Sequence, residues 1–419
     1  MINPAFFKTP DSASAVELSL QKRGLDFQKI ADILDLSSQR GSLTVKLEEL
    51  QKKRNSSSKE LGKLKAQGDE TGFAEVQKSI QGLGQEIKDA KDLQEGVEKK
   101  FLDLLQGLPN FLQDDVPEGS DENDNITIRQ HGSPDDLNSA VPHFEICDSK
   151  NYVDFTRGAK LAGSRFYVYN EQVARLERLL IQFMLNIHSH NGYKERMVPF
   201  LVSDECMFGT GQFPKFKDEY YRLGNDDLNL IPTAEVPLTN LYADEILKET
   251  ELPVLLTAAT PCFRREAGSA GKDTRGLIRV HQFQKVELVI FSTPGQSQEL
   301  HEKLTEDAEA ILKKLNLVYR VQLLCSGDTS SASSKTYDLE VWFPGLKRWV
   351  EISSCSNFLE YQARRAKIRY KNSEGKNEYL HTLNGSGVAA GRLMAALMEY
   401  HQTGDDIDFE SIENLLTVL

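Results

Sequence analysis

Apolar residues recur at seven-residue spacing in two stretches near the start of the chain. In residues 33–64 the heptad positions form two series, Ile33, Arg40, Leu47, Arg54, Leu61 and Leu36, Leu43, Leu50, Ser57, Leu64. In residues 73–104, nine of the ten corresponding positions are apolar, and Gln94 is the exception. The turn-rich segment AQGDETG at 66–72 separates the two stretches. This pattern predicts an antiparallel coiled-coil hairpin with arms of roughly 45–50 Å, at 1.5 Å per residue.

The remainder of the chain has a different pattern. The acidic, turn-rich run DDVPEGSDENDN at 114–125 predicts an exposed connector. Residues 172–190 are amphipathic with helical spacing, and strand-like runs occur at 166–169, 197–202, 228–232, 288–291, 318–324 and 337–342. Because the strands cluster late without regular alternation with helices, we predict an α+β domain with an antiparallel-dominated sheet. The expected domains are residues 1–112, a linker at 113–125, and residues 126–419.

Composition limits the class of protein. The chain has 419 residues, of which 39% are hydrophobic and 27% charged, as in ordinary soluble proteins of two or more domains. It has no apolar run of about 18 residues and no secretory signal pattern, so neither a membrane span nor secretion is expected. The five cysteines are widely spaced and form no CxxC pair. We therefore expect neither a disulfide framework nor a zinc site, and a cytoplasmic location.

The charge is unevenly distributed. The formal net charge of −13 argues against an indiscriminate nucleic-acid binder. Residues 263–287, FRREAGSAGKDTRGLIRVHQFQKVE, nevertheless carry six cations, three anions and three glycines. Such a segment is suited to a polyanion such as a triphosphate, although a solvated basic loop has the same composition.

The first predicted arm is also basic. Residues 46–65 carry seven cations against three anions. This excess fits either the solvated outer face of a coiled coil or contact with a phosphate backbone, and the pattern does not separate the two.

Common nucleotide-binding motifs are absent from the sequence. The nearest match to GxxxxGK[ST] has Glu266 in place of the first glycine and Asp273 after Lys272. No GxGxxG follows a predicted strand. ATP binding would therefore require a fold of another type.

The segment at 263–287 resembles the second signature motif of class II aminoacyl-tRNA synthetases, in the form found in bacterial-type seryl-tRNA synthetases. Further segments match in order and spacing: GTGQFPKF at 209–216, LIPTAEVPLTN at 230–240, KTYDLEVW at 335–342, EISSCSN at 351–357, YQARR at 361–365 and HTLNGSGVAAGR at 381–392. The resemblance covers essentially the whole chain. It implies a class II antiparallel sheet with flanking helices, preceded by a helical hairpin that binds tRNA.

The resemblance also implies the reaction. Serine and ATP form seryl-adenylate and pyrophosphate, and the seryl group then moves to tRNA(Ser) and, in the family, also to tRNA(Sec). A carboxylate is already a nucleophile, so the first step needs alignment and charge neutralisation more than a protein base. Arginine suits this task because its planar fork binds carboxylates and phosphates through two hydrogen bonds.

The family motifs assign individual residues to ATP. Arg264 matches the catalytic arginine that bridges the α-phosphate and the serine carboxylate, and Arg392 matches the arginine that stacks on adenine and reaches the γ-phosphate. The remaining matches around the nucleotide are Arg265 through its backbone, Glu266 and Phe283 at the adenine, and Val280 at the pocket border. Glu351 and Ser354 match ligands of Mg²⁺, which prefers oxygen donors, with Ile352 and Ser353 lining the ATP site between them.

Serine selection is implied for a second group of residues. Serine discrimination requires polar groups that alanine or glycine would leave unpaired. Matches to the family's serine site are Thr233, Ala234, Glu235, Arg264, Glu287, Asn384 and Ser386. Pro199 matches a proline at the family's dimer interface and so implies a homodimer.

The sequence departs from the usual family pattern at a few positions. Lys272 replaces a more common arginine, which keeps the charge but loses the fork. Phe213 replaces a frequent leucine, and the segment at 325–338 lacks the aromatic residue that often follows its Gly-Asp pair.

Two alternatives to an active member of this family predict other sequence features. A catalytically inactive paralogue predicts loss of Arg264, Glu287, Glu351 or Arg392, and all four are present. A ligase that loads serine on a carrier protein or small molecule predicts a short or missing hairpin, whereas both heptad stretches are long here.

Overall fold

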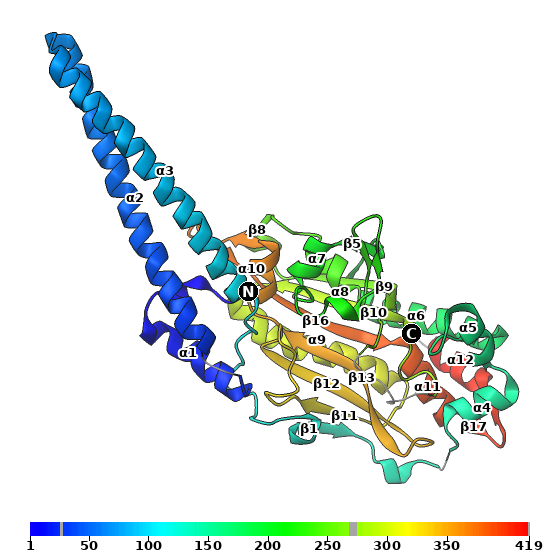
Figure 1. Cartoon of the computed structure of the whole chain (residues 1–419). Helices are drawn as coiled ribbons and strands as arrows, with labels where there is room; N and C mark the ends of the chain where they lie inside the picture. Colours follow the sequence, from blue (N-terminus) through cyan, green and yellow to red (C-terminus); the bar gives the residue numbers. More distant parts are fainter. Residues whose placement is uncertain (26–27, 139, 268–274, 418–419) are drawn as a thin grey trace. The chain divides into compact units, whose positions relative to one another are not determined.

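The computed structural model describes residues 1–25, 28–138, 140–267 and 275–417. The chain divides into two compact units, Ile2–Leu108 and Pro109–Leu419, the second of which includes Met1 (Figure 1). The sequence-based domain boundaries at residues 112 and 126 stay predictions. Lys272 and Asp273 lie outside the described residues.

The smaller unit consists mainly of two long helices. After η1 (Pro4–Phe7) and α1 (Pro10–Lys22), α2 (Gln28–Gln67) and α3 (Glu70–Gln106) pack against each other along the hairpin shown in Figure 1. At 1.5 Å per residue these helices are roughly 60 and 55 Å long. Their seam includes Leu47, Leu50, Ile87 and Ala90. The predicted helical hairpin is confirmed, but its helices are longer than the predicted length of roughly 45–50 Å because both extend beyond the heptad stretches at 33–64 and 73–104.

Arg40 occupies a heptad position where an apolar residue is expected. The Arg40 guanidinium lies 4.0 Å from the Phe101 ring centroid. Its Nη2 donates to Glu98 Oε1 on α3 at 3.1 Å. The charged head is thus paired across the helices while Phe101 is fully buried beneath it, which explains how Arg40 replaces an apolar residue.

The larger unit is built on an eight-stranded sheet. Its strand order is β1 (Ile126–His131), β11 (Tyr319–Leu323), β12 (Lys335–Phe343), β13 (Arg348–Asn357), β16 (His381–Ala389), β10 (Gln282–Ser292), β9 (Val254–Phe263) and β4 (Lys194–Glu195). All neighbouring pairs are antiparallel except β4 and β9. The predicted antiparallel-dominated α+β fold is confirmed.

Different helices pack on the two faces of this sheet. Because side chains alternate along a strand, Leu288 and Ile290 of β10 face one way and Val289 and Phe291 the other. The first pair belongs to the main core with α6 (Glu171–His190), α9 (Ser297–Lys314) and α11 (Ala390–Tyr400). The second pair packs with residues of α8 (Glu235–Asn240) and α10 (Tyr361–Ala366). This second face also carries the polar residues described below.

Shorter elements complete the larger unit. The other helices are α4 (His143–Lys150), α5 (Phe155–Ala162), α7 (Asp204–Gly209), α12 (Phe409–Thr417), η2 (Glu122–Asp124), η3 (Pro134–Asp136), η4 (Lys217–Glu219), η5 (Glu249–Glu251) and η6 (Pro294–Gln296). Two small sheets have two strands each: β2 (Val153–Asp154) with β3 (Val168–Tyr169), and β17 (Gln402–Thr403) with β18 (Asp406–Ile407). Two others have three strands. In one, β7 (Leu228–Leu230) lies between β5 (Leu201–Ser203) and β6 (Arg222–Leu223); in the other, β14 (Arg369–Lys371) lies between β8 (Ile246–Lys248) and β15 (Asn377–Tyr379).

The acidic connector is mostly exposed but is tied to the larger unit. Asp115 accepts from Lys335 Nζ at 2.5 Å, and Asn125 Oδ1 accepts from the Cys325 N–H at 2.8 Å. Among the helices of the described residues, none combines the length and apolar character that crossing a membrane requires.

We expect Gly82→Ala and Gly84→Ala each to stabilise the hairpin. A Cβ at either position would meet nothing within 4 Å, so only the helix propensity changes. Each substitution should raise the free energy of local opening by about 0.8 kcal/mol, measured as slower amide hydrogen exchange along α3. Gly68→Ala is the matched control: its φ of +76° disfavours a side chain, so exchange should become faster. Unchanged exchange in the Gly82 and Gly84 variants would contradict this account.

Candidate active site

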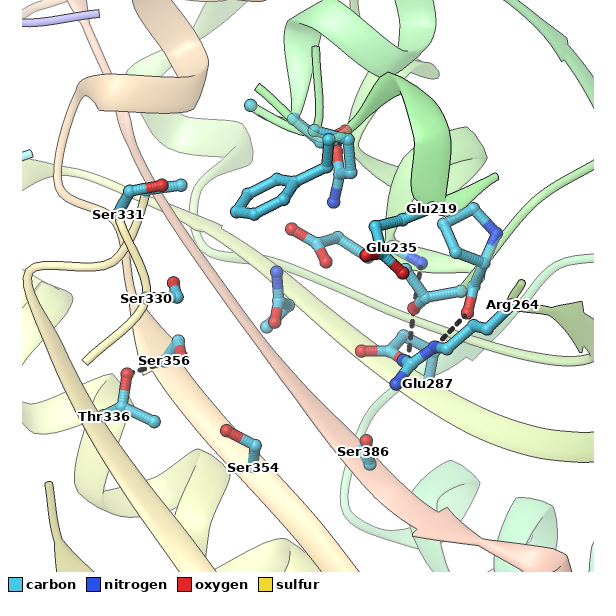
Figure 2. A pocket seen from close by; sticks show the side chains of 18 of the residues that line it. Glu219, Glu235, Arg264, Glu287, Ser330, Ser331, Thr336, Ser354, Ser356 and Ser386 are labelled. Atoms are coloured by element: carbon cyan, nitrogen blue, oxygen red, sulfur yellow. Dashed lines mark hydrogen bonds between the residues drawn. The ribbon is translucent and has the colours of Figure 1, made fainter. Parts of the chain in front are cut away.

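A cavity of about 600 Å³ lies in the larger unit, over the sheet face that carries Glu287. Figure 2 shows Arg264 and Glu287 close together on one side, with Ser354 and Ser386 on the neighbouring strands β13 and β16. A narrower extension of about 50 Å³ shares Arg264 and Glu351 with the main cavity. Glu266, Arg279, Lys285 and Ser386 are also shared by the two parts. The residues that line the extension alone are Leu277, Ile278, Val280, Phe283, Ile352, Ala389, Gly391 and Arg392.

Strand β10 runs along both parts of the cavity. Phe283, Lys285 and Glu287 occupy alternate positions, so their side chains leave the same face of the sheet. Phe283 lines the narrow extension, Glu287 the main cavity, and Lys285 both. The alternation therefore places an aromatic ring, a cation and a carboxylate in line.

Arg264 directly follows the end of β9. Its N–H donates to the His281 carbonyl at 2.9 Å, which closes the end of the β9–β10 pair. Its Nε donates to the Pro232 carbonyl at 3.3 Å, and its guanidinium carbon lies 5.2 Å from the Phe283 ring centroid. These contacts hold a fixed cation between the two parts of the cavity.

The two residues after Arg264 differ in exposure. The Arg265 side chain is exposed and its N–H donates to the Glu219 carbonyl at 2.9 Å, so only its backbone is engaged here. Glu266 lines both parts of the cavity and accepts from Arg279 Nη1 at 2.6 Å.

Arg392, near the start of α11, closes the narrow extension. Its Nε donates to the Ile278 carbonyl at 3.1 Å and its Nη1 to the Glu351 carbonyl at 2.7 Å. Nη1 also lies 3.4 Å from Glu351 Oε2. The Glu351 side chain is 47% exposed, and partial desolvation by the surrounding protein raises its pKa. The charges of Arg392 and Arg264 more than offset this effect, so the pKa lies below its usual value. Glu351 is thus held as a carboxylate.

The opposite end of the cavity is acidic and largely buried. Glu287 Oε2 accepts from Thr233 Oγ1 at 2.9 Å and lies 2.6 Å from Lys285 Nζ. Thr233 Oγ1 also accepts from the Glu235 N–H at 3.1 Å, which joins α8 to β10. This end is suited to a small cation that carries hydrogen-bond donors.

Glu235 is held by a glutamine from α10. Gln362 Nε2 donates to Glu235 Oε1 at 2.7 Å, and Gln362 Oε1 accepts from Thr382 Oγ1 at 2.7 Å, which fixes the orientation of the amide. Burial and the neighbouring Glu287 charge raise the pKa of Glu235 to about 7, although Gln362 acts in the opposite direction. Glu235 therefore changes charge near neutral pH.

An additional carboxylate faces the predicted metal ligands. Asp338 on β12 is the antiparallel partner of Ser354 on β13 and lines the same cavity. Burial and the Glu351 charge raise the pKa of Asp338 well above its usual range. Its Oδ1 is buried without a hydrogen-bond partner in the part of the chain that the structure describes.

The structure thus brings most of the predicted residues to one cavity. Asn384 and Ser386, on β16, line the main part, and Ser386 is the strand partner of Glu287. Ala234 is fully buried, and the Ser353 hydroxyl is turned into the sheet, where it donates to the Ser386 carbonyl at 2.6 Å. These two therefore support the site from behind.

Sequence reasoning gave no individual role to Lys285, Asp338 or Gln362. All three lie in segments that were recognised as motifs, KTYDLEVW and YQARR among them. Their roles depend on partners that the fold supplies from other elements, and no local signal marks them.

The predicted dimer residue, Pro199, is exposed and lies among other exposed apolar residues. The exposed fractions are 97% for Met197, 43% for Phe200 and 38% for Leu201, whereas Val198 between them is buried. Exposed apolar side chains that lie close together in the chain are typical of a surface that is covered by a partner.

Comparisons with known proteins agree with the geometry. Residues 1–112 match the family "Seryl-tRNA synthetase N-terminal domain", and residues 215–401 match the "tRNA synthetase class II core domain (G, H, P, S and T)". A serine–tRNA ligase of Leptospira biflexa is 55% identical over 390 residues, which are 92% of this chain and 93% of that protein. A serine–tRNA ligase of Teredinibacter turnerae is 46% identical over 97% of this chain and 95% of its own length.

A solved structure is similar over nearly the whole chain. The seryl-tRNA synthetase of Pyrococcus horikoshii, determined in complex with ATP, has a TM-score of 0.91 and 34% sequence identity. The match covers 96% of this chain and 95% of that one.

Proposed function

Because the chain belongs to the seryl-tRNA synthetase family of class II tRNA synthetases, we propose that it ligates L-serine to tRNA(Ser) in two steps, the first of which consumes ATP. One observation carries the proposal: a single cavity joins a buried acidic end, at Glu235 and Glu287, to a narrow end closed by Arg392. An amino acid with a free ammonium suits the acidic end, and a nucleotide suits the other.

In the first step the serine carboxylate attacks the α-phosphorus of ATP. A new oxygen–phosphorus bond forms, the bond to the β-phosphate oxygen breaks, and pyrophosphate leaves. Arg264 lies between the two ends and would hold the carboxylate and the α-phosphate together. Arg392 would reach the γ-phosphate, and its side chain and Phe283 would enclose the adenine from opposite faces. In the second step a hydroxyl of the terminal tRNA ribose attacks the seryl carbonyl, and AMP leaves.

The residues near Glu351 fit a magnesium ion that arrives with ATP. Glu351 and Ser354 offer hard oxygen donors, and the unpartnered Oδ1 of Asp338 adds a third oxygen from the neighbouring strand. Within the described ranges, no group of three or more His, Cys, Asp or Glu is arranged to hold a metal ion. This donor set suits Mg²⁺, which usually completes its shell with water and substrate phosphate. When bound, the ion neutralises phosphate charge.

The acidic end provides a way to select serine. Glu235 would pair with the serine ammonium, while Thr233 and Glu287 with Ser386 would surround the side-chain hydroxyl. Asn384 lies against Glu235 and completes this wall. Alanine or glycine would leave these buried polar groups without a partner, which is a strong basis for rejection.

We further propose that the hairpin binds tRNA, that the enzyme acts as a homodimer, and that it works in the cytoplasm. The seven cations of residues 46–65 are all exposed on α2, where they could reach a phosphate backbone. The exposed apolar side chains of Met197, Phe200 and Leu201 form the proposed dimer surface. Serylation of tRNA(Sec) is a second expected activity, inferred from the family resemblance alone.

Arg264→Ala should reduce serine-dependent ATP–pyrophosphate exchange by at least about 100-fold, because a fixed cation at the reacting phosphate is lost. The protein should remain folded, since this side chain is only half-buried. Arg265→Ala is the matched control and should keep exchange within about threefold, because only its backbone is engaged. Exchange at the wild-type rate in Arg264→Ala would refute the assigned role.

The kcat/KM for serine should fall as the pH is lowered from 8 to 6. Below a pKa of about 7 Glu235 is protonated and no longer attracts the serine ammonium. The slope should approach about tenfold per pH unit on the acid side. Glu235→Gln should use serine less well and should lose this dependence on pH. An equally steep fall in Glu235→Gln would show that another group is responsible.

Deletion of residues 43–93 should abolish charging of tRNA(Ser) and leave ATP–pyrophosphate exchange within about threefold of wild type. The two units have separate hydrophobic cores, so the cavity should form without the arm. Full-length protein assayed in parallel is the control. Charging that survives the deletion would exclude the arm as the tRNA contact, and loss of exchange would show that the arm supports the catalytic unit.

A further inference from the structure

A histidine and a glutamate outside the cavity form a buried polar pair in the larger unit. His143 begins α4 and Glu399 lies near the end of α11, and both side chains have no exposed surface. They are 256 positions apart in the chain. A buried pair of this kind needs hydrogen-bond partners for all of its polar atoms, and those partners indicate what the pair does.

Glu399 is supplied with hydrogen-bond donors on both oxygens. Its Oε1 accepts from the backbone N–H of His143 at 3.0 Å and lies 2.9 Å from His143 Nδ1. Its Oε2 accepts from the N–H groups of Gly345 and Leu346 at 2.8 and 3.3 Å. A carboxylate only accepts, so Nδ1 of His143 must carry the proton.

The second ring nitrogen of His143 is therefore an acceptor. Nε2 lies 3.2 Å from the backbone nitrogen of Leu277, whose N–H donates to it. The preceding residue is Gly276, with φ of +79°, and a Cβ there would lie 2.4 Å from Nε2. The imidazole and the backbone of the segment at 276–277 are in such close contact that a side chain at 276 would displace the ring.

The segment held by His143 forms a wall of the narrow extension of the cavity. Leu277 and Ile278 line it, and the Ile278 carbonyl accepts from Arg392 Nε at 3.1 Å. Arg392 and Glu399 both lie on α11. The contacts thus run from Glu399 through His143 and residues 277–278 to Arg392. They connect the segment 277–278 to α11 twice, directly at Arg392 and through His143 at Glu399.

Helix α4 makes further contacts with the same segment. The Arg275 guanidinium carbon lies 4.2 Å from the Phe144 ring centroid, and its Nη2 donates to Asp148 Oδ2 at 3.3 Å. The Arg275 side chain is exposed, and its ion pair with the exposed Asp148 is weak by itself. The bond from Leu277 to His143 is the buried one, and it is the contact whose loss would leave a buried N–H unpaired.

We propose that His143 is a positioning residue for ATP. As the Nδ1–H tautomer, oriented by Glu399, it holds residues 277–278 so that the narrow extension keeps its shape and Arg392 keeps its direction. His143 does not touch the nucleotide and acts through the Leu277 N–H. The inference rests on the proposed function, because it assigns the narrow extension to ATP.

Two isosteric variants separate this role from simple packing. The amide nitrogen of Asn in His143→Asn replaces Nδ1 and can still donate to Glu399, but no atom replaces Nε2. The longer side chain in His143→Gln places an oxygen near Nε2 that can accept from Leu277. His190→Asn is the control, because it makes the same chemical change at the exposed end of α6.

The test is calorimetric titration of each full-length variant with ATP and, separately, with serine. We expect His143→Asn to weaken ATP binding about tenfold, the equivalent of about 1.4 kcal/mol for one buried hydrogen bond. Serine binding should stay within about twofold, and His143→Gln should recover most of the ATP affinity. ATP binding at the wild-type level in a folded His143→Asn, or equal losses for ATP and serine, would overturn the inference.

A second measurement does not depend on any variant folding. In wild-type protein labelled with ¹⁵N-histidine, the His143 resonances should show a protonated Nδ1 and an unprotonated Nε2, the reverse of the usual tautomer. A protonated Nε2 would overturn the inference even if the proposed function holds. If the wild-type protein binds no ATP, both the proposed function and the positioning role of His143 are overturned. If the wild-type protein binds ATP and His143→Asn binds it equally well, only the positioning role is overturned.

Discussion

The site depends on the register of strand β10 between its two neighbours. Phe283, Lys285 and Glu287 share one face of that strand, and at 3.3 Å per residue they span about 13 Å. On one side Glu287 lies opposite Ser386, and on the other β9 ends where Arg264 begins. A shift of one residue would turn all three side chains into the apolar core under α6, α9 and α11. The core on the opposite face therefore fixes the order of groups along the cavity.

The two ends of the cavity have opposite electrostatic character. At the buried end two carboxylates lie close together, and burial with the Glu287 charge raises the pKa of Glu235 to about 7. At the other end partial desolvation raises the pKa of Glu351, but the charges of two arginines outweigh this effect and bring the pKa below its usual value. A bound cation would therefore be stabilised at the acidic end, and a bound anion at the end that carries the arginines. A zwitterionic amino acid beside a triphosphate satisfies both ends at once.

Local pattern predicted part of this structure, and long-range pairing determined the rest. The hairpin was predictable because heptad spacing marks its seam, although Arg40 enters that seam only through Glu98 and Phe101. The strands β9, β13 and β16 carry the site but lack a clear strand pattern: β16 reads HTLNGSGVA, and Pro261 interrupts β9. Resemblance to a family supplied the candidate residues, whereas Asp338, Gln362 and His143 acquire a role only from partners that folding brings from distant elements.

We propose that one cavity holds serine and ATP in contact, with Arg264 between them. The decisive experiment is a crystal structure with a non-hydrolysable seryl-adenylate analogue. We expect the serine ammonium at Glu235, the hydroxyl between Thr233, Glu287 and Ser386, and the adenine between Phe283 and Arg392. An analogue bound outside this cavity, or bound with its adenine at Glu287, would refute this arrangement.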